Sequence, residues 1–342
     1  MAKMTAFRLT GGDPPAGFAE VEVPRPGPGE VLVKMAGVGL CGTDLHFLDA
    51  PGDYPYELPF TLGHENAGWV EDVGDGVDEF SLGEAVAASS GSFCGRCARC
   101  RRGQTNHCFR FGWFGRGFGA DGGLASYLVV PRHELVTLRQ VDPRTAGPLT
   151  DAAATSYHAV RRTLPKLVPG STALVIGVGG LGGFAVQLLK ALSAARIVAV
   201  DRSADRRRAA TALGADEVID GRAGREVRDL TGGEGADVVL DFVGADDTMK
   251  LAVRCAAPMG AIAFVGVGGG TVAVGQGLLP AGCEVFAPMS STIGDLQEVI
   301  ALAEAEVIRV DAEVFPFEQA PEAYRRFRAG EVSGRAVVTP NG

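Results

Sequence analysis

The sequence lacks a surplus of basic side chains, because 32 Lys and Arg residues stand against 41 Asp and Glu residues in a chain of 342. The formal net charge of −9 argues against a sequence-independent hold on nucleic acid or on an anionic membrane, since both require excess positive charge. We therefore expect the partner to be a small molecule or a second copy of the chain.

The sequence also has little that predicts export or membrane insertion. Its first residues lack the charged, apolar and small-residue order of a secretory signal. The longest apolar stretch, Ser171 to Leu189, holds five glycines between Gly177 and Gly183 and runs into Lys190. A strand, a glycine turn and a helix explain this stretch better than a membrane span does, and we expect a cytoplasmic protein.

Intrinsic disorder is excluded, because 46% of the residues are hydrophobic and 21% are charged. The length exceeds what one hydrophobic core usually organises, so two domains are expected. The first 150 or so residues are rich in Gly and Pro and contain short β-branched runs at 30–34, 125–130 and 134–138. This pattern predicts a β-rich domain of short strands.

From about Ser171 onward, apolar runs alternate with longer helical stretches. The predicted strands are 173–177, 197–201, 217–220, 238–242, 261–265 and 284–287, and the predicted helices are 181–194, 204–213 and 249–257. Such alternation predicts a parallel sheet covered by helices on both faces. The tail has helical patterns at 295–304 and 321–328 and short extended segments at 314–317 and 336–338, and periodicity does not assign it to a domain.

A dinucleotide-binding fingerprint lies between the first predicted strand and helix of this region. Its residues are Gly177, Gly179, Gly180, Leu181 and Gly182. Glycines permit the tight turn and the close approach of backbone to a pyrophosphate, which faces the helix N-terminus. A glycine-rich turn that binds nothing is the alternative, but a turn directly between a strand and a helix favours the fingerprint.

Asp201 closes the next predicted strand and is expected to accept hydrogen bonds from the adenosine ribose hydroxyls. A carboxylate at this position repels a 2′-phosphate, which favours NAD over NADP. The alternative is that Arg202, with Arg206 to Arg208 behind it, binds that phosphate.

Four of the seven cysteines follow the spacing Cys94-x2-Cys97-x2-Cys100-x7-Cys108. In a reducing compartment this cluster indicates metal ligation before disulfides, and four thiolates suit a closed tetrahedral zinc site. An iron–sulfur cluster is the chemical rival, but none of the ferredoxin spacings occurs in full. A nucleic-acid-binding zinc module is the other rival, and the acidic chain without a base-reading helix disfavours it.

A second group of metal-binding residue types lies upstream. Cys41 and His64 stand in different short segments, as the ligands of a catalytic zinc often do. Each taken singly is more often a buried structural residue. Thr43, Asp44, His46 and Glu65 add hydroxyl, carboxylate and imidazole groups beside them, as proton transfer and ligand orientation require.

Taken together, these segments resemble the zinc-dependent alcohol dehydrogenases of the medium-chain dehydrogenase/reductase superfamily, nearly from end to end. Gly63-His64-Glu65-Asn-Ala-Gly68, followed by Gly74 and Val77, matches the family's zinc signature. The Cys41 to His46 segment, the four cysteines, the stretch from Pro148 to His158 and the glycine fingerprint occur in the family's order. The chain is most similar to the bacterial NAD-dependent secondary-alcohol type.

The resemblance implies a catalytic zinc held by Cys41, His64 and Asp151. Asp151 stands at the third ligand position, where many members of the family have Cys and others have Asp. Asp151 could instead, or in addition, cap the helix expected to begin at Ala152. The resemblance also implies that Glu65 lies next to this zinc and that Asp44 orients His64.

The implied reaction is the reversible NAD-dependent oxidation of a secondary or aromatic alcohol, with one catalytic and one structural zinc per subunit. Zinc activates the alcohol oxygen, and Thr43 passes its proton through the cofactor ribose to His46, which could otherwise be a plain surface histidine. Arg335 is similar to a family arginine that contacts the cofactor pyrophosphate, with an unliganded rim charge as the alternative.

The implied fold is α/β. A GroES-like β-rich catalytic domain would comprise residues 1–151 with 288–342. A Rossmann domain with a doubly wound parallel sheet would comprise residues 152–287. The active site would lie in the cleft between the two domains. The resemblance favours a homotetramer over a dimer. An aromatic segment with Phe111, Trp113 and Phe114 could line an apolar substrate pocket or pack the cysteine segment against the domain.

Other functions stay open at this point. Within the family, the substrate could be a polyol or another specialised alcohol, and an NADP-linked carbonyl reductase is a less favoured interpretation. A zinc-free quinone or enone reductase of the same superfamily should lack Cys41, His64 and the four-cysteine group. A non-enzymatic binding protein has no reason to keep the metal-ligand types and the cofactor glycines together.

Overall fold

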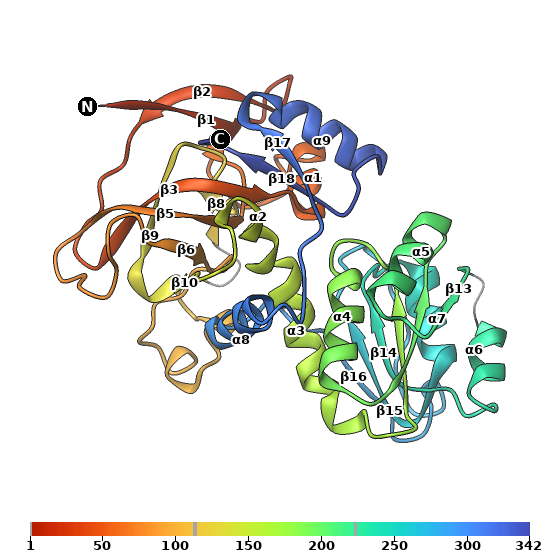
Figure 1. Cartoon of the computed structure of the whole chain (residues 1–342). Helices are drawn as coiled ribbons and strands as arrows, with labels where there is room; N and C mark the ends of the chain where they lie inside the picture. The colour runs from red at the N-terminus through yellow and green to blue at the C-terminus, as the bar shows by residue number, and fades with distance from the viewer. Residues whose placement is uncertain (1, 112–114, 222–223) are drawn as a thin grey trace. The chain divides into compact units, whose positions relative to one another are not determined.

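The computed structural model describes residues 2–111, 115–221 and 224–342, which form two compact units. Unit 1 combines Met1–Ala154 with Ser291–Gly342, and unit 2 is Thr155–Ser290. Both ends of the chain therefore belong to unit 1 (Figure 1).

Unit 1 is built mainly from strands. They are β1 (Lys3–Leu9), β2 (Ala16–Glu22), β3 (Glu30–Gly39), β4 (Phe60–Thr61), β5 (Glu65–Val73), β6 (Ala85–Ala88), β7 (Gly115–Arg116), β8 (Gly119–Ala120), β9 (Tyr127–Pro131), β10 (Leu135–Thr137), β17 (Ala312–Pro316) and β18 (Arg335–Thr339). Its helices are α1 (Gly42–Asp49), α2 (Pro143–Ala146), α8 (Ile293–Glu304) and α9 (Ala320–Ala329), and α3 (Ala152–Thr163) carries the chain into unit 2.

The main sheet of unit 1 has the order β10-β6-β5-β3-β18-β17, and β9 also pairs with β3. The C-terminal strand β18 runs antiparallel to β3, with Val338 opposite Val38, and parallel to β17. Figure 1 shows these blue strands beside the red β3. This pairing assigns the tail to unit 1, which the periodicity of its sequence did not do.

The strand β5 carries two site residues to the middle of this sheet. It begins at Glu65, directly after His64, and it pairs with β3 on one side and with β6 on the other. Side chains of these strands, among them Val33, Val38, Val70 and Val86, lie in a fully buried hydrophobic core. The core therefore fixes the strand ends from which the site residues project.

Unit 2 alternates strands and helices. The strands are β11 (Thr172–Ile176), β12 (Arg196–Val200), β13 (Glu217–Ile219), β14 (Ala236–Asp241), β15 (Ala256–Phe264) and β16 (Glu284–Phe286). The helices are α4 (Gly182–Leu192), α5 (Ala204–Leu213), α6 (Gly224–Leu230) and α7 (Asp246–Cys255).

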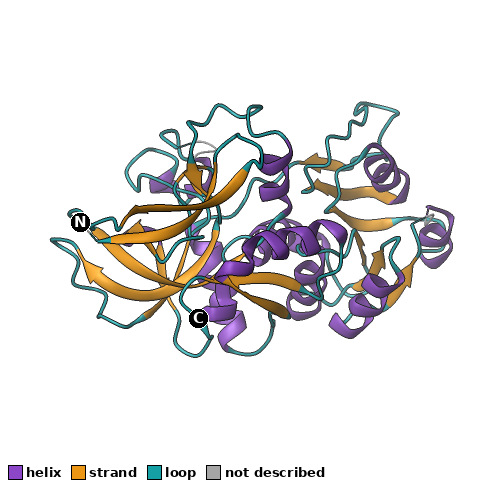
Figure 2. Cartoon of the chain, turned by 90° about the horizontal axis from the view of Figure 1, so that it is seen from above, coloured by secondary structure: helices purple, strands orange, loops and turns teal. Residues whose placement is uncertain are grey.

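All strand pairs of this sheet are parallel, in the order β13-β12-β11-β14-β15-β16. The helices pack in two pairs, α4 with α5 and α6 with α7, and they lie on both sides of the sheet (Figure 2). The predicted parallel sheet covered by helices is therefore confirmed. The order reverses between β11 and β14, and ligands of such sheets bind at the carboxyl ends of the strands at this point.

Local sequence explains why the elements of unit 2 begin and end where they do. The strand β11 has five consecutive buried residues, as expected for a strand covered on both faces. The helix α5 begins after Ser203, whose side chain accepts a hydrogen bond from Arg206 N–H, and it ends at Gly214 with φ 110°. The predicted helix 249–257 is corrected at its end, because Ala256 and Ala257 belong to β15.

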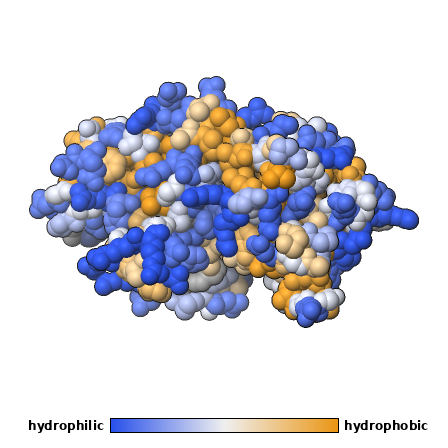
Figure 3. Space-filling view, turned by 90° about the horizontal axis from the view of Figure 1, so that it is seen from below, coloured by the Kyte–Doolittle hydropathy of each residue, from blue (hydrophilic) through white to orange (hydrophobic). Residues whose placement is uncertain are grey.

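The face that Figure 3 shows carries hydrophobic patches among hydrophilic residues. In unit 2, Val267, Val274 and Leu278 are each more than half exposed and lie in the segment between β15 and β16. Within residues 2–111, 115–221 and 224–342, no helix has the length and apolar character needed to cross a membrane.

Candidate active site

Asp44 links two of the predicted metal ligands. Cys41 immediately precedes α1, and its backbone N–H donates to Asp44 Oδ2 at 3.0 Å, which satisfies a donor at the helix start. The other oxygen, Asp44 Oδ1, lies 3.1 Å from His64 Nδ1. One fully buried carboxylate therefore sets the positions of Cys41 and His64, which belong to different segments of unit 1.

Three predicted ligand atoms converge at this point. Asp151 Oδ2 lies 3.8 Å from Cys41 Sγ and 3.5 Å from His64 Nε2, and Glu65 belongs to the same group. His64 is completely buried, and neither ring nitrogen has a hydrogen bond of good geometry with a described residue, although Nε2 faces Asp151 Oδ2. A buried imidazole nitrogen that faces a thiol and a carboxylate in this way fits a zinc ion, which takes N, S and O ligands.

The electrostatics of the group point the same way. Burial alone lowers the pKa of His64, but the Asp44 carboxylate, together with the side chains of Asp151 and Cys41, raises it well above its usual value. Several acidic groups around one imidazole favour a positive charge at their centre, which either a proton or a metal cation supplies.

Glu65 faces a buried arginine. Arg335 Nη2 donates to both Glu65 carboxylate oxygens at 2.7 Å and to the Leu40 carbonyl at 2.9 Å. Burial raises the pKa of Glu65 to about 7, although Arg335 opposes the shift. A Cβ on Gly39 would lie 1.9 Å from Glu65 Oε2, so glycine is needed there to admit the carboxylate. The role of Arg335 toward a pyrophosphate stays a prediction.

Thr43 and His46 occupy the same helix as Asp44. The Thr43 hydroxyl lies 3.7 Å from Cys41 Sγ, and His46, three residues further on, is exposed. Positions three apart lie on one face of a helix, so Thr43 and His46 share a face of α1. Asp151 immediately precedes α3, which begins at Ala152, so its position also suits the capping alternative.

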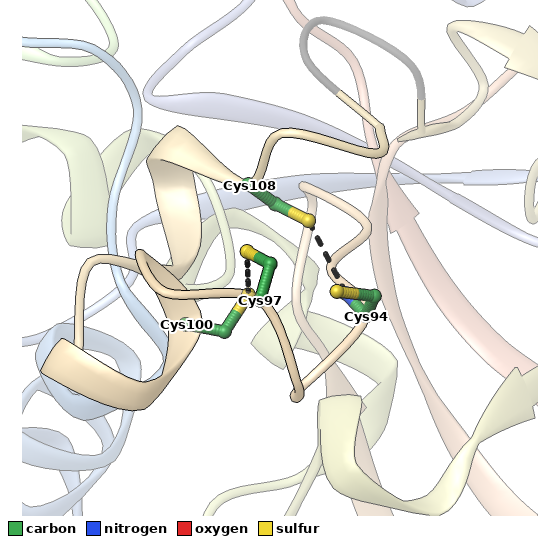
Figure 4. A group of neighbouring side chains, drawn as sticks. All are labelled: Cys94, Cys97, Cys100 and Cys108. Carbon is green, nitrogen blue, oxygen red and sulfur yellow. Dashed lines mark hydrogen bonds between the residues drawn. The ribbon is translucent and has the colours of Figure 1, made fainter.

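The second metal-ligand group consists of Cys94, Cys97, Cys100 and Cys108. Their sulfur atoms lie within 4.8 Å of one another, all four thiols are free, and Figure 4 shows them turned toward one another. A tetrahedral zinc with bonds of about 2.3 Å requires sulfurs about 3.8 Å apart. Backbone hydrogen bonds from Cys100 and Phe109 lower the pKa of Cys97 to about 6, which favours the thiolate that zinc binds.

This cysteine lobe, residues 93–108, is held at its start by two neighbouring side chains. Phe93 N–H donates to Glu134 Oε1, and the Phe93 carbonyl contacts His133 Nε2, both at 2.8 Å. Glu134 in turn forms a buried ion pair with Arg116. The hydrophobic cluster of the lobe is small and consists largely of the cysteines themselves, so a metal ion bound by them would add to the contacts that order it.

The glycine fingerprint forms a pocket of about 450 Å³ within unit 2, at the reversal point of the sheet. Gly177 has φ 83°, and a Cβ there would lie 2.5 Å from Val243 Cγ2. A side chain at Gly177 would therefore strain the turn and fill the pocket. Gly179, Gly180, Leu181 and Gly182 also line it, and α4 begins at Gly182, so the helix N-terminus faces the pocket as a phosphate-binding turn requires.

Asp201 lies at the rim of this pocket. Its Oδ2 accepts a hydrogen bond from Val178 N–H at 2.9 Å, and its Oδ1 accepts one from Ser203 N–H at 2.8 Å. Each carboxylate oxygen has a second lone pair, so both can still accept a ribose hydroxyl. The structure thus adds a second role for Asp201, which is to hold the glycine turn against the end of β12.

The arginines after Asp201 have different surroundings. Arg202 and Arg206 line the pocket, and the Arg202 side chain is 81% exposed. Arg207 donates to the carbonyls of Asp201 and Arg202, and Arg208 pairs with Asp205 on the exposed face of α5. The alternative to NAD is that these arginines bind the 2′-phosphate of NADP. Of the four, Arg202 and Arg206 line the pocket where that phosphate would lie.

Two side chains that contact the metal-ligand group could not be predicted from the sequence. The Ser90 hydroxyl donates to Asp151 Oδ1 at 3.3 Å, and the Phe118 ring stacks on His64 with centroids 4.3 Å apart. Serine and phenylalanine are common residues, and only the strand register and the chain path bring these two to His64. Of the aromatic residues considered for a substrate pocket, Phe111 is exposed, and Trp113 and Phe114 lie outside the described residues.

Two family models match the chain. Residues 27–140 match the alcohol dehydrogenase GroES-like domain, and residues 180–305 match the zinc-binding dehydrogenase domain. The first match contains the two cysteine-bearing segments of unit 1, and the second begins within the glycine fingerprint.

Relatives match the chain over nearly its whole length. An NAD-dependent alcohol dehydrogenase of Sulfurisphaera tokodaii is 33% identical, with 98% of this chain and 100% of the relative covered. A D-arabinose 1-dehydrogenase (NADP(+)) of Saccharolobus solfataricus is 32% identical, with 99% of each covered. Among solved structures, the alcohol dehydrogenase of Aeropyrum pernix is similar with a TM-score of 0.92 and 32% identity, covering 98% of this chain and all of the other.

Proposed function

The chain belongs to the zinc-dependent alcohol dehydrogenase family of the medium-chain dehydrogenase/reductase superfamily, and from this we propose that it oxidises a secondary or aromatic alcohol with NAD and reduces the carbonyl product in reverse. It is an oxidoreductase that acts on CH–OH groups. A polyol or sugar substrate is the second candidate, since a D-arabinose dehydrogenase is among the relatives that match the whole chain.

The observation that carries the proposal is the convergence of Cys41 Sγ, His64 Nε2 and Asp151 Oδ2 in one buried group. Three ligand types of this kind leave a fourth position of a tetrahedral zinc for the substrate. A zinc ion held there would supply Lewis acidity toward the alcohol oxygen, and NAD bound at the glycine fingerprint would supply the hydride acceptor.

The chain's own residues supply the proton path and the orientation. Thr43 lies beside Cys41, where its hydroxyl can accept a proton from the alcohol, and exposed His46 on the same face of α1 can release it to solvent. Asp44 keeps His64 in the tautomer with a proton on Nδ1, which leaves Nε2 free to bind metal. Asp201 at the pocket rim supports a preference for NAD.

We further propose a cytoplasmic homo-oligomer, with a tetramer favoured over a dimer. The sheet of unit 2 ends on the short edge strand β16, and exposed Val267, Val274 and Leu278 lie in the segment before it. An edge strand beside exposed hydrophobic side chains favours pairing with a second copy. Light scattering coupled to size-exclusion chromatography tests this, and a mass equal to one chain would exclude it.

The proposed activity is tested by absorbance of the reduced nicotinamide. We expect turnover with NAD, and less with NADP, for members of a panel of primary, secondary, cyclic, benzylic and polyol alcohols. Metal analysis of the same sample should give about two zinc ions per chain. Turnover restricted to polyols would favour the second candidate, and turnover that survives complete removal of zinc would contradict the proposal.

A further inference from the structure

Ser90 touches the carboxylate that we propose as the third zinc ligand. Its hydroxyl donates to Asp151 Oδ1 at 3.3 Å, and the Ser90 residue is 2% exposed. The two residues lie 61 positions apart in the sequence. Ser90 lies two residues after the end of β6, and Asp151 lies one residue before the start of α3. The contact is thus formed by the tertiary fold of unit 1 and by nothing local.

The path of the chain explains how Ser90 reaches the site. In the antiparallel pair of β5 with β6, Asn66 is opposite Ala88, the last residue of β6. His64 lies directly before β5 and Ser90 lies two residues after β6, so both lie at the same end of this strand pair. The pairing therefore brings the segments that carry His64 and Ser90 close together.

The two oxygens of Asp151 have different neighbours. Oδ2 faces Cys41 Sγ and His64 Nε2, whereas Oδ1 receives the Ser90 hydroxyl. Ordering a carboxylate costs conformational entropy when a metal binds. A hydrogen bond to Oδ1 restricts the rotation that would exchange the two oxygens, and it is present before a metal binds.

We propose that Ser90 is a positioning residue that orients Asp151, so that Oδ2 alone is presented to the metal. The proposal rests on the proposed zinc site, and it goes beyond it by naming a residue outside the ligand set. Ser90 would act through Asp151, to which its hydroxyl donates.

The first test compares two neighbouring serines. We expect Ser90→Ala to raise the dissociation constant of the zinc at this site about tenfold, as losses of ligand-orienting hydrogen bonds do. Ser89 is the matched control, because its hydroxyl donates to the Gly91 carbonyl and not to Asp151. Ser89→Ala should change the constant less than twofold. Competition with a chromophoric chelator measures both values without any substrate.

The second test repeats the change in an Asp151→Cys background. A thiolate has a single ligand atom, so no second oxygen is left for Ser90 to hold. Ser90→Ala should then weaken zinc binding less than twofold. A tenfold loss in the protein that keeps Asp151, together with a small loss in the Asp151→Cys background, supports a role through Asp151, because a packing effect would be equal in both.

Two results would overturn the inference. Unchanged zinc affinity in Ser90→Ala would show that the hydroxyl does not orient the ligand, and equal losses in both backgrounds would assign it a packing role. Asp151→Ala separates these failures from a failure of the proposed site. Retention of both zinc ions after that change would refute Asp151 as a ligand, whereas loss of one zinc leaves the Ser90 comparison decisive.

Discussion

At the scale of single residues, Glu65 and Arg335 form an ion pair whose members lie 270 positions apart and are both buried. Glu65→Gln keeps a hydrogen-bond acceptor but removes the negative charge that the carboxylate, with its pKa of about 7, carries beside the guanidinium at alkaline pH. We expect the free energy of unfolding to fall by about 3 kcal/mol, since breaking a buried pair from one side leaves an uncompensated charge. Urea denaturation followed by circular dichroism measures the change.

The control for that variant is an ion pair on the surface. Glu331 pairs with Arg325, and both side chains are about half exposed. Glu331→Gln should cost less than about 1 kcal/mol, because water screens the pair. Similar losses for the two variants would mean that the burial of Glu65 does not govern its contribution.

Asp201→Ala is expected to weaken NAD binding about tenfold or more and NADP binding much less. The variant would lose the proposed hydrogen bonds from the ribose of NAD to the carboxylate, and hydrogen bonds to a charged group contribute about 1.5–3 kcal/mol. Fluorescence titration with both reduced cofactors checks this. Arg208→Ala, which removes a side chain paired with Asp205 away from the pocket, serves as the control. An unchanged ratio of the two affinities would refute the ribose role.

A site residue can be recognised in the sequence when its side chain belongs to a type that commonly binds metals or takes part in catalysis. Cys41, His64 and Asp151 belong to residue types that bind metals and lie in segments that resemble the family's ligand-bearing segments, so the sequence predicts them as ligands. Ser90 gives no such indication, because serine is a common residue and only the folded chain brings this one to Asp151. Likewise, the sequence does not indicate that Arg335 and Glu65 are partners.

At the scale of elements, the cysteine lobe has few apolar side chains of its own, and its order should depend on a metal ion. Cys100→Ser is expected to lose one zinc per chain and to lower the midpoint of thermal unfolding. Calorimetry with metal analysis measures both. Cys283→Ser is the matched control, because this cysteine lies in unit 2 outside both metal-ligand groups. Normal zinc content and unfolding in Cys100→Ser would contradict a structural zinc.

Elements were predictable where both of their ends are marked in the sequence. The helix 204–213 was predicted at its observed bounds, because Ser203 and Gly214 delimit it. The helix α7 begins three residues before the predicted Met249, since its first turn is polar and carries Asp246 and Asp247. The short helix α6 was not predicted, because seven residues with one fully buried side chain give no clear periodicity.

At the scale of the whole molecule, the metal ligands and the dinucleotide pocket lie in different units. Dialysis against a chelator should therefore abolish alcohol oxidation and leave binding of reduced NAD within about twofold of its original value. Turnover and nicotinamide fluorescence measure the two properties, and added zinc should restore turnover. Unchanged turnover in the zinc-free protein would favour the reductase alternative, and loss of cofactor binding would refute independent sites.

The fold class was predictable because strand and helix patterns alternate strictly in unit 2, and the α/β prediction is confirmed by the parallel sheet and the two family models. The tail was less predictable. Its strands 312–316 and 335–339 are short, and only their pairing with each other and with β3 shows which unit contains them. Such long-range pairing leaves no periodic trace in the sequence.

The position of β18 beside β3 also governs the order in which the chain can assemble during synthesis. Every strand of the unit 2 sheet precedes β17 and β18 in the chain. During synthesis the strands of unit 2 can therefore pair before β18 emerges, while the metal-binding unit still has one edge of β3 open and Glu65 lacks its arginine. The metal-binding unit is thus closed by strands that are made after the whole of unit 2.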